Sequence, residues 1–145
     1  MGTNSRRFHK NNEFPNEAFV QQAIEAYFTE QGFLIEQGGY SDLICRDLKR
    51  GQRWIIEANG QTSAAGLDFR TGLGQLLQAM QDPTALYGLA VPNTPAFVEQ
   101  CQKVSDWVRL SLRLHWLLID QDGTVRIISP DQTLDESGTG RISRK

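Results

Sequence analysis

One run of the sequence, residues 85–91, is apolar at nearly every position and carries no charged side chain. It lies between two segments of helical pattern, residues 69–81 and 96–109. A short continuous apolar run of this kind is typical of a strand that is buried on both faces of a sheet. Because both faces of such a strand must be covered, we expect helices to pack against the sheet.

The remaining sequence pattern predicts an α/β sandwich around this strand. Apolar residues at three- and four-residue spacing predict helices over residues 17–31, 69–81 and 96–109. Strand-like segments are residues 33–36, 41–47, 52–59, 85–91, 114–119 and 124–128. Segments 41–47 and 52–59 are separated by a short turn, which predicts a β-hairpin. The predicted order αβββαβαββ gives a mixed β-sheet flanked by helices.

The length of 145 residues fits one domain with its own core. We expect a flexible polar arm over residues 1–14, a single domain over 15–130 and a flexible polar tail over 131–145. No apolar run is long enough to span a bilayer or to act as a signal peptide, so we expect a cytoplasmic protein without a membrane partner. Cys45 and Cys101 lack metal-site spacing and are expected to be buried free thiols.

Two carboxylates are the first candidates for chemistry. Glu57 lies near the end of an apolar strand, and Asp42 opens the strand that precedes it. In the predicted hairpin these residues converge at one end of the sheet, where two like charges need a cation or a proton between them. Mg²⁺ suits such a pair, because it takes one or two carboxylates together with water and phosphate oxygens. The simpler alternative is a pair of solvated carboxylates at strand ends.

The order of acidic and amide residues resembles a known family. Glu17 lies on the first helix, Asp42 on a strand, Glu57, Ala58 and Asn59 on the next strand, and Gln75 in a later helix. This arrangement is similar to that of the PD-(D/E)xK nuclease superfamily, over roughly residues 16–128. The resemblance implies a restriction-endonuclease-like sandwich that hydrolyses phosphodiester bonds of DNA with Mg²⁺ or Mn²⁺. Each motif is short, so the order and spacing carry the match.

The resemblance also implies roles for individual residues. Asp42 and Glu57 would be the carboxylate ligands of the metal, and the backbone carbonyl of Ala58 would be a further ligand. Glu17 matches an acidic residue that holds a metal-bound water in some branches, with Glu25 as a competitor for this role. Gln75 would point from its helix toward the site, and the resemblance leaves open whether Gln21 does so from the first helix.

Asn59 departs from the family pattern, which has a lysine at this position. Asparagine can donate a hydrogen bond but supplies no charge, and the loss of such a contact can cost roughly 10²–10³ in rate. Arg70 is the best local substitute, although a structural role for Arg70 is an equal alternative. Gly60 follows Asn59 directly and either admits a phosphate or simply ends the strand.

Two functions from different classes therefore stay open. The first is a metal-dependent DNA endonuclease that Asn59 weakens. The second is a catalytically inactive nuclease fold that binds nucleic acid or a protein partner. The formal net charge of −2 does not indicate nucleic-acid binding, although basic residues gather at both ends of the chain and at 49–53. RNA is an alternative to DNA, and a double-strand cut would favour a homodimer.

Overall fold

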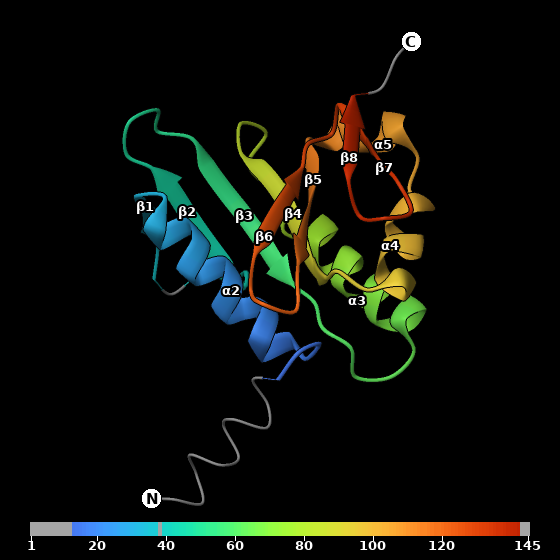
Figure 1. The fold of residues 1–145 in the computed structure, drawn as a ribbon. Coiled ribbons are helices and arrows are strands. Elements are labelled where there is room, and N and C mark those ends of the chain that lie inside the picture. Colours follow the sequence, from blue (N-terminus) through green and yellow to red (C-terminus); the bar gives the residue numbers. More distant parts are fainter. Residues whose placement is uncertain (1–12, 38, 143–145) are drawn as a thin grey trace, which may run out of the picture.

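A mixed six-stranded sheet forms the centre of the fold in a computed structural model that describes residues 13–37 and 39–142 (Figure 1). The strands lie in chain order: β1 (Phe33–Ile35), β2 (Leu43–Asp47), β3 (Arg53–Ala58), β4 (Leu86–Pro92), β5 (Leu114–Ile119) and β6 (Val125–Ile128). β1, β2 and β3 pair antiparallel, β3, β4 and β5 pair parallel, and β6 returns antiparallel to β5. Helices make the two parallel connections, which cannot be closed by a tight turn.

Helices cover both faces of this sheet. Helix α2 (Glu17–Glu30) packs on one face, and α3 (Ala65–Gln78) with α4 (Pro95–Gln102) packs on the other. Successive strand residues point to opposite faces. Along β3, Trp54 and Ile56 therefore join the cluster under α2, whereas Ile55 joins the cluster under α3. The same alternation directs Glu57 to the face of α3.

The main elements agree with the sequence pattern within a few residues, and two helices differ from it. Helix α3 begins at Ala65, four residues before the predicted start. The carboxylate of Asp68 accepts hydrogen bonds from the backbone of Thr62 and Ser63, which ties the preceding loop to the first turn of the helix. This contact is polar, so apolar spacing does not reveal it.

The single helix predicted over residues 96–109 is divided into α4 and α5 (Asp106–Leu112). Ser105 is the N-cap residue of α5 and adopts an extended backbone conformation, with φ −69° and ψ 151°. An extended residue interrupts the hydrogen-bond ladder of a helix, so the chain changes direction between Gln102 and Asp106.

The flexible tail predicted from residue 131 is wrong for most of its length. Residues 132–142 form a hairpin of β7 (Gln132–Leu134) and β8 (Gly140–Ile142). Leu134 is 5% exposed and joins the core beside α4. Arg109 of α5 donates hydrogen bonds of 2.7–3.4 Å to three backbone carbonyls of segment 128–132. A buried leucine and a buried guanidinium thus order this segment.

Most of the predicted N-terminal arm, residues 1–12, lies outside the described residues. The described part of that arm, Glu13 and Phe14, leads directly into α2. Across residues 13–37 and 39–142, no helix combines the length and apolar character that crossing a bilayer requires.

Replacing Arg109 by Met is expected to lower the free energy of unfolding by roughly 1–3 kcal/mol. Arg109 is 1% exposed and its guanidinium lies 5.3 Å from the ring centroid of Trp116. Methionine keeps the aliphatic volume, but it removes the guanidinium hydrogen bonds to the carbonyls of segment 128–132. Denaturant unfolding would measure the loss. Arg126→Met is the control, because Arg126 is an exposed partner of Asp120 and such pairs contribute little. Equal effects of both variants would contradict the anchoring role.

Candidate active site

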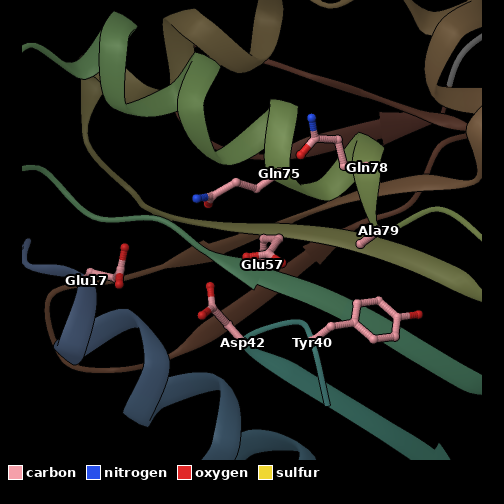
Figure 2. Close-up of a pocket in the computed structure, with 7 residues that line it drawn as sticks. All are labelled: Glu17, Tyr40, Asp42, Glu57, Gln75, Gln78 and Ala79. Atoms are coloured by element: carbon pink, nitrogen blue, oxygen red, sulfur yellow. The ribbon is translucent and has the colours of Figure 1, made fainter.

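A pocket of about 400 Å³ opens beside the C-terminal end of β3, between the start of α2 and the face of α3 (Figure 2). This volume lies in the range of roughly 300–1,000 Å³ that ligand sites occupy. The residues that line the pocket are Glu17, Tyr40, Asp42, Glu57, Gln75, Gln78 and Ala79. Four of the six residues predicted as catalytic are therefore brought together, although they lie far apart in the sequence.

Asp42 and Glu57 are held in place by the pairing of β2 with β3. The alternation of β3 turns Glu57 toward α3, and this residue is only 6% exposed. Asp42 lies just before β2, where its Oδ2 accepts a hydrogen bond of 2.9 Å from the backbone N–H of Ala58. This bond fixes the Asp42 carboxylate beside the last residues of β3. Figure 2 shows the two carboxylates directed into the same space.

Glu17 reaches the pocket because the chain after β3 runs directly against the start of α2. A Cβ added at Gly60 would collide with the backbone nitrogen of Glu17, so only glycine allows this approach. The N–H of Gln61 also donates to the carbonyl of Pro15 at 3.0 Å. Neither role considered for Gly60, admission of a phosphate or a simple end of the strand, includes this packing against the start of α2. This close approach explains how the first turn of α2 meets the end of β3.

Glu25 and Gln21 do not line the pocket. The side-chain amide of Gln21 donates to Glu25 Oε2 at 2.8 Å and to the backbone carbonyl of Asp42 at 2.8 Å. Gln21 therefore contacts the backbone of Asp42 outside the pocket, and Glu17 is the acidic residue of α2 that lines the pocket. Gln75 projects from α3 across the pocket toward the three carboxylates (Figure 2).

The carboxylates that line the pocket repel one another when they are ionised. Burial, followed by hydrogen bonding to Asp42 and the charge of Asp42, raises the pKa of Glu57 from 4.5 to about 8. Burial and the charges of Asp42 and Asp68 also raise the pKa of Glu17. Among the residues that line the pocket, none is basic. The arrangement therefore favours a proton or a bound cation, and it disfavours an anion that arrives alone.

The donor set suits a hard divalent cation. Asp42 and Glu57 offer carboxylate oxygens, and Mg²⁺ needs only one or two of these when water and phosphate complete its shell. The N–H and C=O of one strand residue point to the same neighbour, so we expect the carbonyl of Ala58 to face the side of Asp42. Within residues 13–37 and 39–142, no three or more His, Cys, Asp or Glu side chains are grouped as a ready-made metal site.

Asn59 does not line the pocket. It is 6% exposed, and its Nδ2 donates a hydrogen bond of 2.5 Å to the backbone carbonyl of Asp68 in α3. A Cβ added at Gly72 would collide with that same Nδ2. Asn59 thus fills the narrow space between β3 and α3, where Gly72 lets the two elements approach. It joins the helix to the sheet.

Arg70 is likewise not brought to the pocket. It is exposed on α3, and its Nη1 lies 3.6 Å from the position of a Cβ added at Gly66, on the side where Gln100 of α4 also lies. The structure therefore directs Arg70 toward α4. The positive charge that the family lysine would provide has no replacement among the described residues of the pocket.

Tyr40, Gln78 and Ala79 line the pocket without having been predicted. Gln78 follows Gln75 by three residues, so helical spacing alone places the two on one face. Tyr40 lies two residues before Asp42 in a bend that precedes β2, so strand alternation does not place it. The signal for Gln78 was present in the sequence once Gln75 was chosen as a site residue, and no comparable signal marked Tyr40.

Replacing Asn59 by Lys is expected to destabilise the protein without a gain in activity. The longer side chain would lose the bond to the Asp68 carbonyl and overfill the space at Gly72, at a cost of roughly 1–3 kcal/mol. Thermal unfolding and a cleavage assay would measure the two effects. Gln121→Lys, at an exposed turn, is the control for the added charge. Increased cleavage at unchanged stability would show that a side chain at position 59 can reach the pocket.

Comparison with known proteins identifies the fold. No family model matches the chain, and no curated protein matches it. The structure is similar to the crystal structure of an XisH family protein from Nostoc punctiforme PCC 73102, with a TM-score of 0.56 and 17% sequence identity. The match covers 74% of this chain and 95% of that chain. The mixed six-stranded sheet flanked by helices is a restriction-endonuclease-like fold, as the resemblance of the sequence implied.

Proposed function

We propose that this protein is a divalent-metal-dependent nuclease that hydrolyses phosphodiester bonds of DNA, with Mg²⁺ or Mn²⁺ as its cofactor. One observation carries the proposal: Asp42 and Glu57 enter one pocket, where burial and the neighbouring Asp42 raise the pKa of Glu57. Glu17 and Gln75, on two different helices, face the same space. The restriction-endonuclease-like fold agrees with this arrangement.

Each pocket residue has a role that its chemistry allows. Asp42 and Glu57 would hold the ion, which when bound supplies a Lewis acid and lowers the pKa of a coordinated water. Hydrolysis adds the oxygen of water to phosphorus and breaks one P–O ester bond, so the water must lose a proton and the leaving ester oxygen must gain one from solvent. Glu17 has a raised pKa and can accept that proton. The amide of Gln75 can donate a hydrogen bond to a phosphate oxygen or to the water.

The lack of a basic residue in the described pocket favours a second candidate, a nuclease fold without efficient catalysis. Asn59 is engaged with α3 and Arg70 is directed toward α4, so neither side chain offsets the charge of a phosphate. Loss of one preorganised electrostatic contact costs roughly 10²–10³ in rate. Such a protein would bind nucleic acid or a protein partner instead of cutting DNA.

A paired measurement separates the two candidates. Calorimetry would measure Mn²⁺ binding, and labelled single- and double-stranded DNA and RNA would be incubated with Mg²⁺, Mn²⁺ or EDTA. Binding together with metal-dependent cleavage supports the nuclease. Binding that Asp42→Asn removes, without any cleavage, supports the inactive fold. Failure to bind at millimolar Mn²⁺ contradicts a metal-dependent site. Glu99→Gln removes an exposed carboxylate on α4 and is the control.

Oligomeric state bears on the same proposal. One pocket of this kind can cut one strand at a time, so a double-strand break would require two copies of the chain. We propose a homodimer for such a reaction, and light scattering after size exclusion would measure it. A monomer that still makes double-strand breaks in one binding event would contradict this geometry.

A further inference from the structure

The pocket extends past its carboxylates to a second end that the hydrolytic chemistry does not use. In Figure 2, Glu17 lies at one end, Glu57 lies in the middle, and Tyr40 with Gln78 lies toward the other end. We propose that Tyr40 and Gln78 form a subsite for a nucleobase, and that the substrate is single-stranded or locally unpaired DNA. This inference rests on the proposed function and names its substrate class.

Tyr40 has the exposure that a stacking residue needs. It is 63% exposed although it lines the pocket. The ring–ring contacts found among the described residues do not involve Tyr40, whereas the buried Trp54 and Phe28 contact each other. The ring of Tyr40 therefore has a face available for a ligand. Aromatic side chains of this kind bind unpaired bases by stacking, with little dependence on sequence.

The opposite wall of the subsite is suited to the edge of a base. Gln78 of α3 lines the same end of the pocket as Tyr40 and supplies an amide there, whereas Gln75 is directed toward the carboxylates. An amide carries both a donor and an acceptor, as the edge of a base does. The nearby Arg53 is bound by Glu36 through hydrogen bonds of 3.0 and 3.1 Å. A nucleobase therefore fits this end better than a second phosphate.

This geometry selects against paired DNA. A base within a duplex is stacked on both faces, so Tyr40 can reach a base face only when that base has left the stack. With the base against Tyr40, the adjoining phosphate would lie toward Asp42 and Glu57, which are closer to the middle of the pocket. Stacking and cleavage would then act on one nucleotide, and an unpaired strand presents it at the lowest cost.

The test measures binding of a fluorescein-labelled oligothymidylate by anisotropy, with Ca²⁺ present in place of Mg²⁺ to slow hydrolysis. Tyr40→Ala is expected to weaken binding by about 10- to 100-fold, whereas Tyr40→Phe should keep most of the affinity because it retains the ring. Trp107→Ala is the matched control, since Trp107 is an aromatic residue on α5 with 71% exposure outside the pocket. The same thymidylate annealed to its complement should bind more weakly to the wild type.

Binding of abasic oligonucleotides would locate the base that stacks on Tyr40. Oligonucleotides with one missing base at successive positions should bind wild type normally except where the missing base is the one that stacks, and Tyr40→Ala should lose this position dependence. Equal binding of single strands by wild type and Tyr40→Ala, with a native unfolding midpoint, would overturn the subsite. If Mn²⁺ binding and cleavage persist in that case, the nuclease proposal is retained without the base subsite. Tyr40-dependent binding without any Mn²⁺ binding would support the subsite and contradict the nuclease.

Discussion

Asp42→Asn and Glu57→Gln are each expected to lower DNA cleavage by at least about 10²–10³-fold and to remove measurable Mn²⁺ binding. Both substitutions keep the size of the side chain and remove its negative charge. In Asp42→Asn, the amide oxygen would be a neutral ligand beside Glu57, so the pair would lose half of the charge that attracts the ion. The expected loss is therefore in metal affinity and in rate together.

The two variants should leave the fold intact, for different reasons. In Asp42→Asn, an amide oxygen can still accept the hydrogen bond from the N–H of Ala58. In Glu57→Gln, a buried side chain that holds a proton below about pH 8 is replaced by a neutral amide of similar size, so no charge is buried. Circular dichroism would establish folding, calorimetry would measure Mn²⁺ binding, and single-turnover assays would measure the rate. Glu99→Gln should behave as wild type, being outside the pocket.

Wild-type cleavage in both folded variants would place the catalytic site elsewhere. Glu17→Gln provides a graded comparison, because Glu17 is proposed to accept a proton and not to hold the ion. This variant should keep Mn²⁺ binding while its cleavage rate falls. A loss of Mn²⁺ binding in Glu17→Gln would instead make Glu17 a ligand.

The sheet and its helices were predictable because their signals are local. The apolar run that became β4 and the apolar stripe of α2 each occupy a single element, and burial on both faces of a strand follows from the run itself. The hairpin β7–β8 was missed because its cause is not local. Its order comes from Leu134 packing beside α4 and from Arg109 on α5, both contacts between distant segments.

The sequence predicted that the acidic residues meet in one site, but it did not predict where the side chains of Asn59 and Arg70 lie. Alternation along β3 brings Glu57 to the pocket, and pairing with β2 brings Asp42 beside it. The orientation of the Asn59 side chain depends on Gly72. Because Gly72 has no Cβ, α3 can lie close enough for Asn59 to donate a hydrogen bond to a helix carbonyl. The direction of Arg70 depends on where α4 lies. Neither helix position can be derived from the spacing of site residues in the sequence.

Metal affinity is expected to rise steeply with pH up to about pH 8. The pKa of Glu57 is raised to about 8 by burial and by Asp42, so at lower pH the metal-free pocket holds a proton that the ion must displace. When binding releases one proton, affinity changes about tenfold for each pH unit below that pKa and levels off above it. Mn²⁺ titrations from pH 6 to pH 9 would measure this slope, and buffers of different ionisation enthalpy would count the proton.

Loss of the proton from Glu57 lowers the stability of the metal-free protein as pH rises. Glu57 holds its proton up to about pH 8 when folded, whereas the unfolded chain releases it near the ordinary value of 4.5. The folded state therefore binds more protons between these values, and its free energy of unfolding falls across this window. The contribution of Glu57 is fully present below about pH 4.5 and is lost as pH rises through about 8, on the order of a few kcal/mol in total.

Comparison of wild type with Glu57→Gln isolates this contribution from other groups. His115 is buried and its pKa is lowered, so its effect on stability has the opposite sign below about pH 6.5. Because both proteins contain His115, the difference between their unfolding free energies should report Glu57 alone. In the absence of metal, that difference should favour the variant increasingly from pH 5 to pH 8. Parallel curves would show that Glu57 ionises normally, and the pocket would then lack the charge crowding from which a metal site was inferred.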